Sequence, residues 1–520
     1  MYITQALKRA VQINRHGITT IDGTRQRSWA GFAERVAKLA GVFHGLDLRA
    51  GGRVAILALN QDRYLEYFFA VLWAGGILVP LNIRLSPREL CYMLNDAGAE
   101  ILLVDDTFQS VLPAFSGKLT TVKHVVFAGA GPVPQGSVDY EESLAKTQAL
   151  RDVERGGDHV AGIFYTGGTT GLAKGVMLTH DNIVSNALSL LASLATAGKG
   201  WIYLHAAPMF HIAGCSTSCS LTLLACTHVF IPKFEVAAML NTIQEHRVTH
   251  TFLAPTMINM LASFPGVETY DLSSLRTIFY GASPMPEAVL RKAMQVLPAC
   301  EFIQGYGMTE TSPLITMLAG EYHTFAGPCA GKTASAGQAA PGIEVKIVDG
   351  EGHEVPSGTI GEIITRGPHV MHGYWNKPAE TAQALRGGWM YTGDAGYMDD
   401  EGFVYVVDRV KDMIITGGEN VYSVEVENAI YQHPSVAMCA VIGIPSEEWG
   451  EAIHAVVFCK EGCSVSVAEL IAHCKERLVG YKCPRTVDIR QAPLPLSGAG
   501  KILKTELRAP FWVGKTRRVS

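Results

Sequence analysis

Apolar residues in the first half of the chain follow two alternating patterns, one helical and one typical of short buried strands. From Trp29 to Leu46 they recur every three to four residues, which predicts a helix. The residues that follow, GGRVAILALN, indicate a turn and a Val/Ile/Leu strand, and AEILLVDD repeats this pattern near residue 100. Helices that alternate with short buried strands predict βαβ units.

The longest apolar run, from Tyr67 to Leu81, is shorter than the ~20 residues that a membrane-spanning helix needs. Gly75, Gly76 and Pro80 interrupt this run, so we expect a buried helix that leads into a strand. The start of the chain, MYITQALKRAVQINRHG, is basic and weakly amphipathic and lacks the apolar centre of a signal peptide. We therefore expect an N-terminal helix, no integral membrane segment and a cytoplasmic protein.

The pattern changes in the second half of the chain. Residues 129–158 are rich in Gly, Pro, Ser and charge, which predicts a surface connection into the strand VAGIFYT. Beyond Gly337, turn-punctuated strands such as GIEVKIVDGEGHEVPSGTIGEIITRG predict antiparallel hairpins. After GFVYVVDRVKDMIITGG, two strands (AMCAVIGIP and AIHAVVFC) and a helix (VAELIAHCKERL) have a periodicity of their own. We expect a separate small domain that begins near residues 408–412.

Composition narrows the classes of function. The 520 residues are 48% apolar, enough for a large core in about three folding units. The net charge of −5 and the lack of a long basic run do not indicate binding to nucleic acid or to an anionic membrane. The eleven cysteines are scattered, and the closest pairs have three intervening residues instead of the two of a metal knuckle. We expect most cysteines in the core, and small-molecule chemistry as the function.

The stretch YTGGTTGLAKGVMLTH, from Tyr165 to His180, concentrates glycine and threonine around one lysine. Such a loop between a strand and a helix presents backbone N–H groups to phosphate oxygens, and the helix N-terminus adds a favourable field. Lys174 supplies a mobile charge, but Ala173 and Gly175 beside it exclude a Walker A loop. The alternative is a glycine-rich surface turn that binds nothing.

This stretch resembles the signature loop of the adenylate-forming superfamily, which contains acyl-CoA synthetases, amino-acid adenylation domains and beetle luciferases. The usual loop has Ser in place of Gly168 and Pro in place of Ala173. Five further motifs follow in the family's order: YGASPMP (280–286), QGYGMTET (304–311), WMYTGDAGYMDDEGFVYVVDR (389–409), GGEN (417–420) and LPLSGAGKILKTELR (494–508). The resemblance therefore covers residues 165–508.

The resemblance implies an α/β fold in two parts. The large N-terminal domain, residues 1–408, would contain two α/β subdomains and a distorted β-barrel over about 330–408. A small, mobile α+β C-terminal domain, residues 413–520, would carry the catalytic lysine. A hinge at residues 409–412, centred on Lys411, would join the two and absorb the backbone changes of domain rotation.

The resemblance also implies the reaction, in which ATP activates a carboxylate as an acyl-adenylate and CoA then takes the acyl group. Lys501, which follows GAG in its loop, would bridge the carboxylate and the α-phosphate. Lys504, in contrast, is interpreted as a solvated surface lysine. Glu310 would ligate Mg²⁺ together with Thr170, and Thr309 would contact the α-phosphate. Catalytic roles thus fall on Lys501, Glu310, Thr309, Lys174 and His211.

The implied ATP/AMP-binding residues come from the phosphate loop, the adenine turn and the ribose site. Tyr306 offers a flat face to adenine, while Asp394 and Arg409 suit the ribose hydroxyls. The set comprises Thr166, Gly167, Gly168, Thr169, Thr170, Gly171, Gly281, Ala282, Ser283, Pro284, Gln304, Gly305, Tyr306, Gly307, Met308, Asp394, Val406 and Arg409. Gly417, Gly418 and Glu419 would let the pantetheine chain of CoA approach the backbone.

The acyl pocket is expected around residues 205–226, where His211 matches an aromatic gate. The predicted lining is His205, Phe210, His211, Cys215, Tyr280 and Gly281. This segment contains neither a Lys or Arg for a second carboxylate nor the Asp that holds an amino-acid ammonium, so we expect a neutral, mainly apolar acid. Hydroxycinnamates such as ferulate or coumarate and medium-chain fatty acids are both candidates, and a long-chain fatty acid is a further alternative.

Three classes of protein remain to be compared. The first is an AMP-forming acid:CoA ligase, as a monomer or homodimer that uses Mg²⁺, ATP and CoA. The second keeps the fold but changes the acceptor, as in a ligase for a carrier protein or a luciferase-like oxygenase. The third is a non-catalytic nucleotide-binding protein, which predicts the loss of Lys501, Glu310 or Asp394; all three are present.

Overall fold

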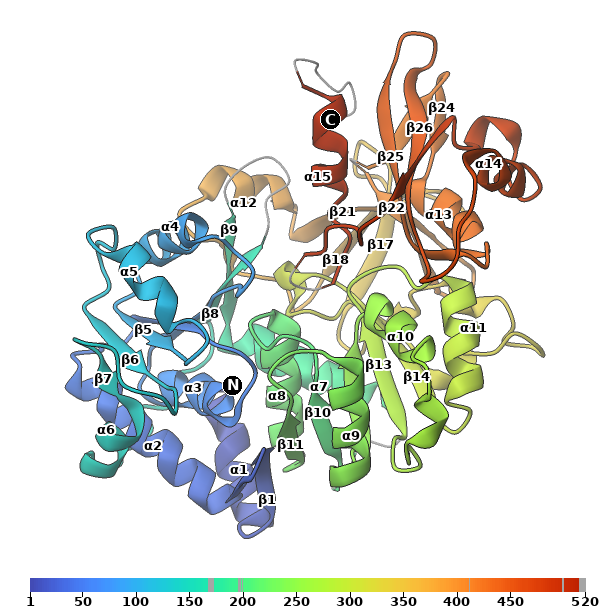
Figure 1. The fold of residues 1–520 in the computed structure, drawn as a ribbon. Coiled ribbons are helices and arrows are strands. Elements are labelled where there is room, and N and C mark those ends of the chain that lie inside the picture. The colour runs from blue at the N-terminus through green and yellow to red at the C-terminus, as the bar shows by residue number, and fades with distance from the viewer. Residues whose placement is uncertain (167–172, 195–197, 199, 411, 498–499, 514–520) are drawn as a thin grey trace.

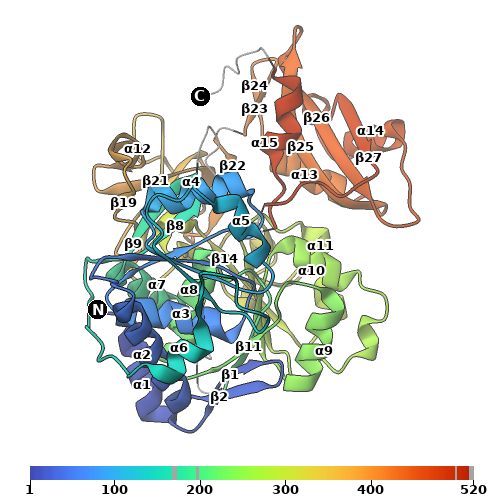
Figure 2. The same cartoon turned by 60° about the vertical axis from the view of Figure 1, so that its left-hand side comes forward.

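Four β-sheets organise the part of the chain that the computed structural model describes, namely residues 1–166, 173–194, 198, 200–410, 412–497 and 500–513. Two large sheets flanked by helices form the lower body of the molecule in Figure 1, and a sheet of the C-terminal residues lies above them. Seen from a second side, the C-terminal sheet with α13–α15 projects from that body (Figure 2). The expected α/β architecture is confirmed.

The first sheet has eight strands and a parallel centre, with antiparallel pairing at one edge. Its order is β19 (Gly373–Tyr374), β9 (Lys174–Thr179), β8 (Val160–Thr166), β4 (Ile77–Pro80), β3 (Arg53–Leu57), β5 (Ile101–Val104), β6 (His124–Phe127) and β7 (Val138–Asp139). Side chains alternate between its faces. Val54 and Ile56 join the core of α2 (Trp29–Gly45) and α3 (Asp62–Trp73), whereas Ala55 and Leu57 pack with α4 (Pro87–Ala97) and α5 (Leu112–Phe115).

The second sheet has nine strands and supports the substrate side of the molecule. Its order is β16 (Gln338–Ala339), β15 (Thr316–Leu318), β14 (Glu301–Tyr306), β13 (Thr277–Gly281), β12 (His250–Leu253), β10 (Ile202–His205), β11 (Thr227–Phe230), β1 (Ile18–Asp22) and β2 (Arg25–Ser28). One face packs on α9 (Val236–His246), α10 (Pro255–Ala262) and α11 (Glu287–Val296). Helices α7 (His180–Ala192) and α8 (Ile212–Leu223) lie on the other face, between the two sheets.

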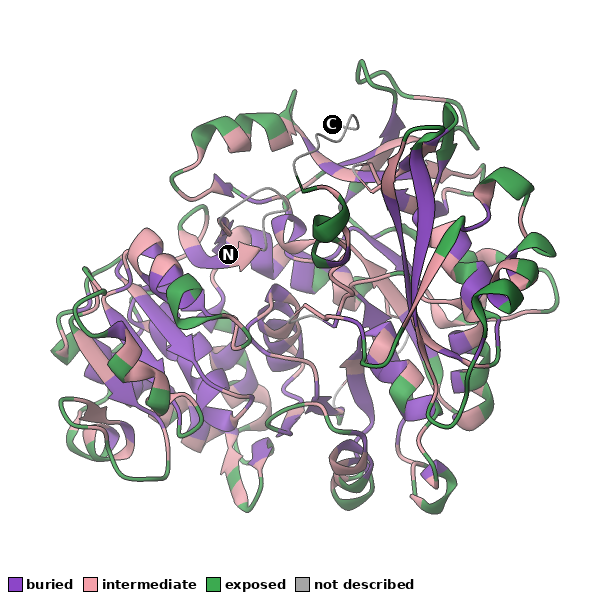
Figure 3. Ribbon diagram, turned by 45° about the horizontal axis from the view of Figure 1, so that its top comes forward, coloured by how far each residue is buried: buried purple, intermediate pink, exposed green. Residues whose placement is uncertain are grey.

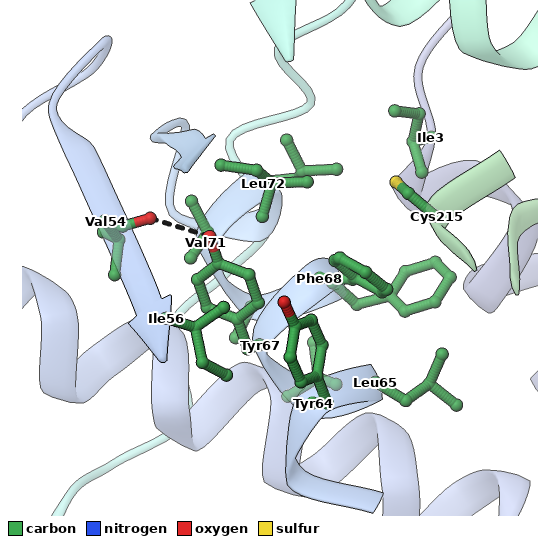
Figure 4. Packing of buried hydrophobic residues seen from close by; sticks show 14 of the residues in the cluster. Ile3, Val54, Ile56, Tyr64, Leu65, Tyr67, Phe68, Val71, Leu72 and Cys215 are labelled. Carbon is green, nitrogen blue, oxygen red and sulfur yellow. Dashed lines mark hydrogen bonds between the residues drawn. The ribbon is translucent and has the colours of Figure 1, made fainter. Parts of the chain in front are cut away.

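The largest core lies where α1 (Thr4–Asn14), α2, α3, α7 and α8 meet. Figure 4 shows aromatic residues of α3 at its centre, including Tyr64 and Phe68, whose rings lie 5.1 Å apart. Tyr67 Oη donates to the Val54 carbonyl at 2.7 Å and accepts from the Val79 N–H at 2.8 Å. These bonds satisfy the buried hydroxyl and tie α3 to two strands. Figure 3 shows the buried strands at the centre of each layer.

Two five-stranded sheets follow. The first contains β17 (Glu344–Val348), β18 (Gly361–Arg366), β20 (Leu385–Arg386), β21 (Trp389–Met398) and β22 (Val404–Arg409), with α12 (Pro378–Ala384) beside it. It is the half-barrel of the large domain. The C-terminal sheet contains β23 (Ile414–Thr416), β24 (Glu419–Val421), β25 (Val436–Ser446), β26 (Gly450–Cys459) and β27 (Thr486–Arg490), with helices α13 (Ser423–Tyr431), α14 (Val467–Lys475) and α15 (Lys504–Arg508).

One regional prediction needs correction, and one pairing was not predicted. Residues 129–158 are more than a surface connection, because they hold β7 and α6 (Tyr140–Lys146), and Tyr140 is buried. The hairpin of β1 and β2 was not foreseen either: β1 pairs in parallel with β11, about 200 residues later in the sequence. None of the described helices has the length and apolar character needed to cross a membrane.

Candidate active site

A connected cleft of 3180 Å³ lies between the large body and the C-terminal sheet. Its wall contains residues just beyond the carboxyl ends of neighbouring parallel strands: Ala207 after β10, Ala254 after β12, Ala282 after β13 and Gly307 after β14. Ligands of open parallel sheets bind at this edge, where the loops that follow the strands converge. The cleft is therefore the candidate active site.

At the nucleotide side of the cleft, strand pairing brings a carboxylate and a guanidinium together. Asp394 on β21 is paired in register with Arg409 on β22, and Arg409 Nε lies 2.7 Å from Asp394 Oδ1. Tyr306 Oη donates to the other carboxylate oxygen at 2.8 Å. All three line the cleft, so the predicted adenine and ribose residues form one hydrogen-bonded group.

Close backbone approach explains the glycines of the predicted adenine turn. A Cβ at Gly281 would lie 2.2 Å from the Gly305 carbonyl oxygen, and a Cβ at Gly307 would lie 1.8 Å from that of Pro313. Both positions therefore require glycine. Ala282 adopts a φ of 71°, a left-handed conformation that a non-glycine residue rarely takes, and it lines the cleft beside Ser283 and Pro284.

Glu310 occupies a short 3₁₀ turn, η3 (Thr309–Thr311), and its carboxylate is largely buried. Tyr374 Oη donates to Glu310 Oε1 at 2.9 Å, and Lys174 Nζ lies 5.1 Å from the centre of the Tyr374 ring. Lys174, Tyr374, Thr309 and Glu310 all contribute to the cleft wall. Tyr374 thus lines the cleft although the sequence motifs did not identify it; its only signal is the GYW triplet, in which Gly373 and Tyr374 form β19.

Lys501 reaches the same cleft from the C-terminal domain. Burial and the positive charge of Arg409 lower the pKa of Lys501 to about 8, while the carboxylates of Asp394 and Glu310 act in the opposite direction. Lys501 lines the same cleft as Arg409, Asp394 and Glu310.

Contacts between the two parts hold the lysine loop in place. Arg84 Nη1 donates to the Ser497 carbonyl at 2.7 Å, and Thr256 Oγ1 donates to the Gly500 carbonyl at 3.2 Å. Nearby, Asn259 Nδ2 donates to the Ala437 carbonyl at 3.1 Å. None of the three donors belongs to a motif, because their role depends on surfaces that meet only in the folded chain.

The reading of Lys504 as a solvated surface lysine is wrong. Its ammonium lies 2.7 Å from Glu427 Oε1 and donates to Ser423 Oγ at 2.6 Å. Ser423 also donates to Asp408 from its backbone N–H and its hydroxyl. The side chain of Lys504 therefore stabilises the junction of β22, α13 and α15.

The phosphate loop is followed by a strand, whereas a helix was expected there. Thr166 ends β8 and Lys174 begins β9, and the two are paired across the antiparallel ladder. The loop therefore joins two strands, whereas α7 begins only at His180, so no helix N-terminus follows the loop. Gly167, Gly168, Thr169, Thr170 and Gly171 lie outside the described residues, as does Lys411 of the predicted hinge.

The glycine hairpin lies apart from the cleft. Gly417 and Gly418 form the turn between β23 and β24, with φ values of 61° and 85°, and they are exposed together with Glu419. The Gly417 N–H donates to the Trp449 carbonyl at 2.8 Å. Among described residues, the cleft wall includes Lys501 and none of these three.

Three of the six residues predicted for the acyl pocket lie in the described cleft wall; Gly281, between Tyr280 and Ala282, does not. His205, His211 and Tyr280 line the cleft. Tyr280 Oη lies 2.8 Å from His323 Nε2, and His205 Nε2 lies 2.9 Å from His228 Nδ1. Burial, together with the neighbouring His228, holds the pKa of His205 well below its usual range. The buried imidazole pair is therefore neutral at physiological pH.

Phe210 and Cys215 need correction. Both belong to the core beneath α8, and neither contributes to the described cleft wall. Figure 4 shows Cys215 close to Ile3 within this core. For Cys215 the reason is helical geometry: residues three or four apart share a face, and Gly214, Thr217 and Leu221 occupy the face toward the cleft, whereas Phe210 precedes the helix.

Fold and site together define an enzyme class that binds a nucleotide between a large α/β domain and a small lysine-bearing domain. The model of the AMP-binding enzyme family matches residues 7–375, and that of the AMP-binding enzyme C-terminal domain matches residues 425–501. The chain belongs to the AMP-binding enzyme family.

Similar proteins share nearly the whole chain. A feruloyl-CoA synthase of Amycolatopsis sp. is 38% identical, with 97% of this chain and 98% of the relative covered. A fatty acid–[acyl-carrier-protein] ligase, ScoC of Streptomyces coeruleorubidus, is 34% identical, with 93% and 91% covered. The crystal structure of ATP-bound MatB from Rhodopseudomonas palustris superposes with a TM-score of 0.86 at 30% identity, covering 98% and 99%.

Proposed function

We propose that this protein is an ATP-dependent, AMP-forming carboxylic acid:CoA ligase that acts on a neutral, mainly apolar acid. The observation that carries the proposal is Lys501, which lies in one cleft with Arg409, Asp394 and Glu310 although more than 90 residues of chain separate it from each of them. A feruloyl-CoA synthase is similar over nearly the full length, which supports CoA as the acceptor.

The first step joins two anions, so the site must offset their repulsion. The carboxylate attacks the α-phosphate of ATP, pyrophosphate leaves, and an acyl-adenylate remains. Lys501 and Arg409 supply positive charge on one side, and Lys174 supplies it beside Tyr374 on the other. Such fixed charges act where the transition state gains negative charge, and they need no reorganisation during the reaction. Asp394, held by Tyr306 and Arg409, would accept hydrogen bonds from the ribose hydroxyls.

The residues present fit a Mg²⁺ ion that travels with the nucleotide. The described residues contain no cluster of three or more His, Cys, Asp or Glu that would form an all-protein metal site. Mg²⁺ is commonly held by one or two carboxylates together with substrate phosphates and water. Glu310, which uses one carboxylate oxygen for Tyr374, would hold the ion, and the ion would neutralise phosphate charge.

The second step transfers the acyl group from the adenylate to the CoA thiol, which attacks the carbonyl as AMP leaves. The thiol needs access to that carbonyl, whereas Lys501 occupies the cleft and the glycine hairpin faces solvent. We propose that the small domain, residues 413–520, rotates about a hinge at 409–412 against residues 1–408. Gly417, Gly418 and Glu419 would then line the path of CoA.

The test is the release of AMP and CoA-thioester from Mg²⁺-ATP and CoA across acetate, octanoate, palmitate, benzoate, coumarate and ferulate. We expect both products in equal amounts with an aryl or medium-chain acid. AMP without thioester would mean that water hydrolysed the adenylate and that the acceptor is not CoA; it would point to another acceptor, such as the acyl-carrier protein in the name of the relative ScoC. Loss of both products with every acid, from a folded protein that binds ATP, would overturn the ligase assignment.

A further inference from the structure

One branch of the cleft forms a pocket between the nine-stranded sheet and α8. Tyr203 and His205 on β10, Phe252 on β12 and Phe279 on β13 line its floor. Alternate residues of a strand point to the same face, so Tyr203 and His205 share the face that α7 and α8 cover. The roof consists of one face of α8, with Gly214, Thr217 and Leu221 along it, and of Leu190, Leu191 and Leu194 at the end of α7.

Depth along this pocket is set by the two elements that line it. At a rise of ~1.5 Å per residue, the eight steps from Ala213 to Leu221 of α8 span about 12 Å. On the floor, His205 lies at the carboxyl end of β10, and Tyr203 lies ~6.6 Å deeper at ~3.3 Å per residue. Trp201 lies deeper still, with its ring stacked on His250 at a centroid distance of 3.8 Å.

Most polar groups of this pocket already have partners. His205 is paired with His228, and Ser220 Oγ donates to the Ser216 carbonyl within α8 at 3.0 Å. Tyr203 differs: it is only 4% exposed, and it packs in an apolar cluster with Trp201 and Leu221.

Two hydrogen-bond donors approach the hydroxyl of Tyr203. The Thr217 side chain and the Phe252 backbone N–H lie next to this hydroxyl, and both lower its pKa against the larger raising effect of burial. The Thr217 hydroxyl can accept as well as donate a hydrogen bond, so Tyr203 and Thr217 form a polar pair in an otherwise apolar part of the pocket wall. Buried hydroxyls normally find a partner, so an oxygen atom of a bound ligand would complete this pair.

We propose that Tyr203 and Thr217 recognise a ring oxygen, a phenolic hydroxyl or its methyl ether, at the far end of an aryl acid bound in this pocket. The preferred substrate is then a hydroxylated aryl acid whose ring lies between α8 and the aromatic floor. The inference rests on the proposed function, because it assumes that the carboxylate lies at the Lys501 end of the cleft.

Chain-like acids suit this position less well. A methylene group placed against Tyr203 would remove its hydroxyl from water without offering it a hydrogen bond. A ring that bears an oxygen avoids this penalty and gains contact with Phe252, Phe279 and Trp201. One net hydrogen bond corresponds to a roughly threefold to tenfold preference.

The experiment compares kcat/KM for 4-coumarate with that for cinnamate, which lacks only the ring hydroxyl, in four proteins: wild type, Tyr203→Phe, Thr217→Val and Tyr397→Phe. Tyr397 stacks on Tyr405 of the half-barrel at 4.6 Å and lies outside the described cleft wall, which makes it a matched control. Octanoate serves as a chain-like acid. Thermal unfolding of each variant reports on folding.

We expect the wild type and Tyr397→Phe to prefer 4-coumarate over cinnamate by threefold to tenfold or more. In Tyr203→Phe this ratio should fall to about one, mainly through KM, while activity on cinnamate and octanoate is kept or rises. Thr217→Val should reduce the ratio by a smaller factor. It also serves as the test if Tyr203→Phe does not fold, because Thr217 lies at the half-exposed helix face.

Two results would overturn the inference while leaving the ligase assignment intact. One is a wild type that makes thioester but does not distinguish 4-coumarate from cinnamate. The other is a folded Tyr203→Phe protein that keeps the wild-type ratio. A wild type inactive on every acid is a different outcome, since it refutes the proposed function and, with it, the inference that depends on it.

Discussion

The two segments of the C-terminal domain to which we assign roles, the Lys501 loop and the Gly417–Gly418 turn, lie in different surroundings. The Lys501 loop lies inside the cleft, held by Arg84 and Thr256 of the large domain. The Gly417–Gly418 turn, on the same domain, is exposed outside it. Under the proposed function, one orientation of a rigid domain cannot bring both segments to the same carbonyl, so we propose that the arrangement described here serves adenylation and that thioester formation uses another.

The largest effect is expected from Lys501→Ala, which tests whether Lys501 serves adenylation and not thioester formation. We expect ATP/pyrophosphate exchange to fall by about 10²–10³-fold, because a charge aimed at the transition state is lost. Thioester formation from supplied acyl-adenylate should stay within about threefold of wild type. Lys475→Ala, an exposed lysine at the end of α14, is the control for loss of a charge from this domain. Equal loss of both half-reactions would contradict the division.

The opposite effect is expected from Gly417→Ala. The φ of 61° disfavours a side chain by ~1–2 kcal/mol, and the new Cβ would lie 3.0 Å from the Trp449 ring. Thioester formation should slow by about tenfold, while pyrophosphate exchange should be unchanged. Gly462→Ala is the matched control for backbone strain, since the φ of Gly462 is 73° and no atom lies within 4 Å of the added Cβ. A similar loss in both variants would indicate a general effect of strain.

The pH dependence of adenylation should report the ammonium of Lys501. Its pKa in the free protein is about 8, so the charged form is present below that pH and is lost as pH rises through it. We expect kcat/KM for pyrophosphate exchange to decline above pH 8 and to approach a tenfold loss per pH unit. In Lys501→Arg the decline should move to higher pH, because a guanidinium stays charged. An unchanged profile in that variant would assign the decline to another group.

The smallest effect is expected at the contact that holds the lysine loop. Arg84→Ala removes one hydrogen bond to the Ser497 carbonyl, worth ~0.5–1.5 kcal/mol. Pyrophosphate exchange should fall by about threefold, with thioester formation from supplied adenylate unchanged or faster. Arg49→Ala, whose side chain is exposed and contacts Asp47, controls for the loss of a surface arginine. If both half-reactions fall together in Arg84→Ala, the contact does not select an orientation.

Sequence reasoning was most successful where residues act through the local chain. The run from Tyr67 to Leu81 is α3 followed by β4, as its glycines and proline predicted. Asp394 and Arg409 lie on strands joined by a hairpin, so motif and geometry agree. Prediction failed for α8, because this helix has small or apolar residues on both faces and its hydrophobic periodicity does not indicate which face meets the cleft. The wrong face was chosen at Cys215, which belongs to the core.

The amino-acid sequence by itself determined the class of fold, the order of the motifs and the chemistry of the candidate residues, because these depend on local periodicity and residue type. Only the tertiary structure decided which face of α8 meets the substrate, that Tyr374 binds Glu310, that Lys504 is paired with Glu427, and that Lys501 rather than Gly417 occupies the cleft. Each of these depends on contacts between segments distant in the chain, whose energies no local pattern records.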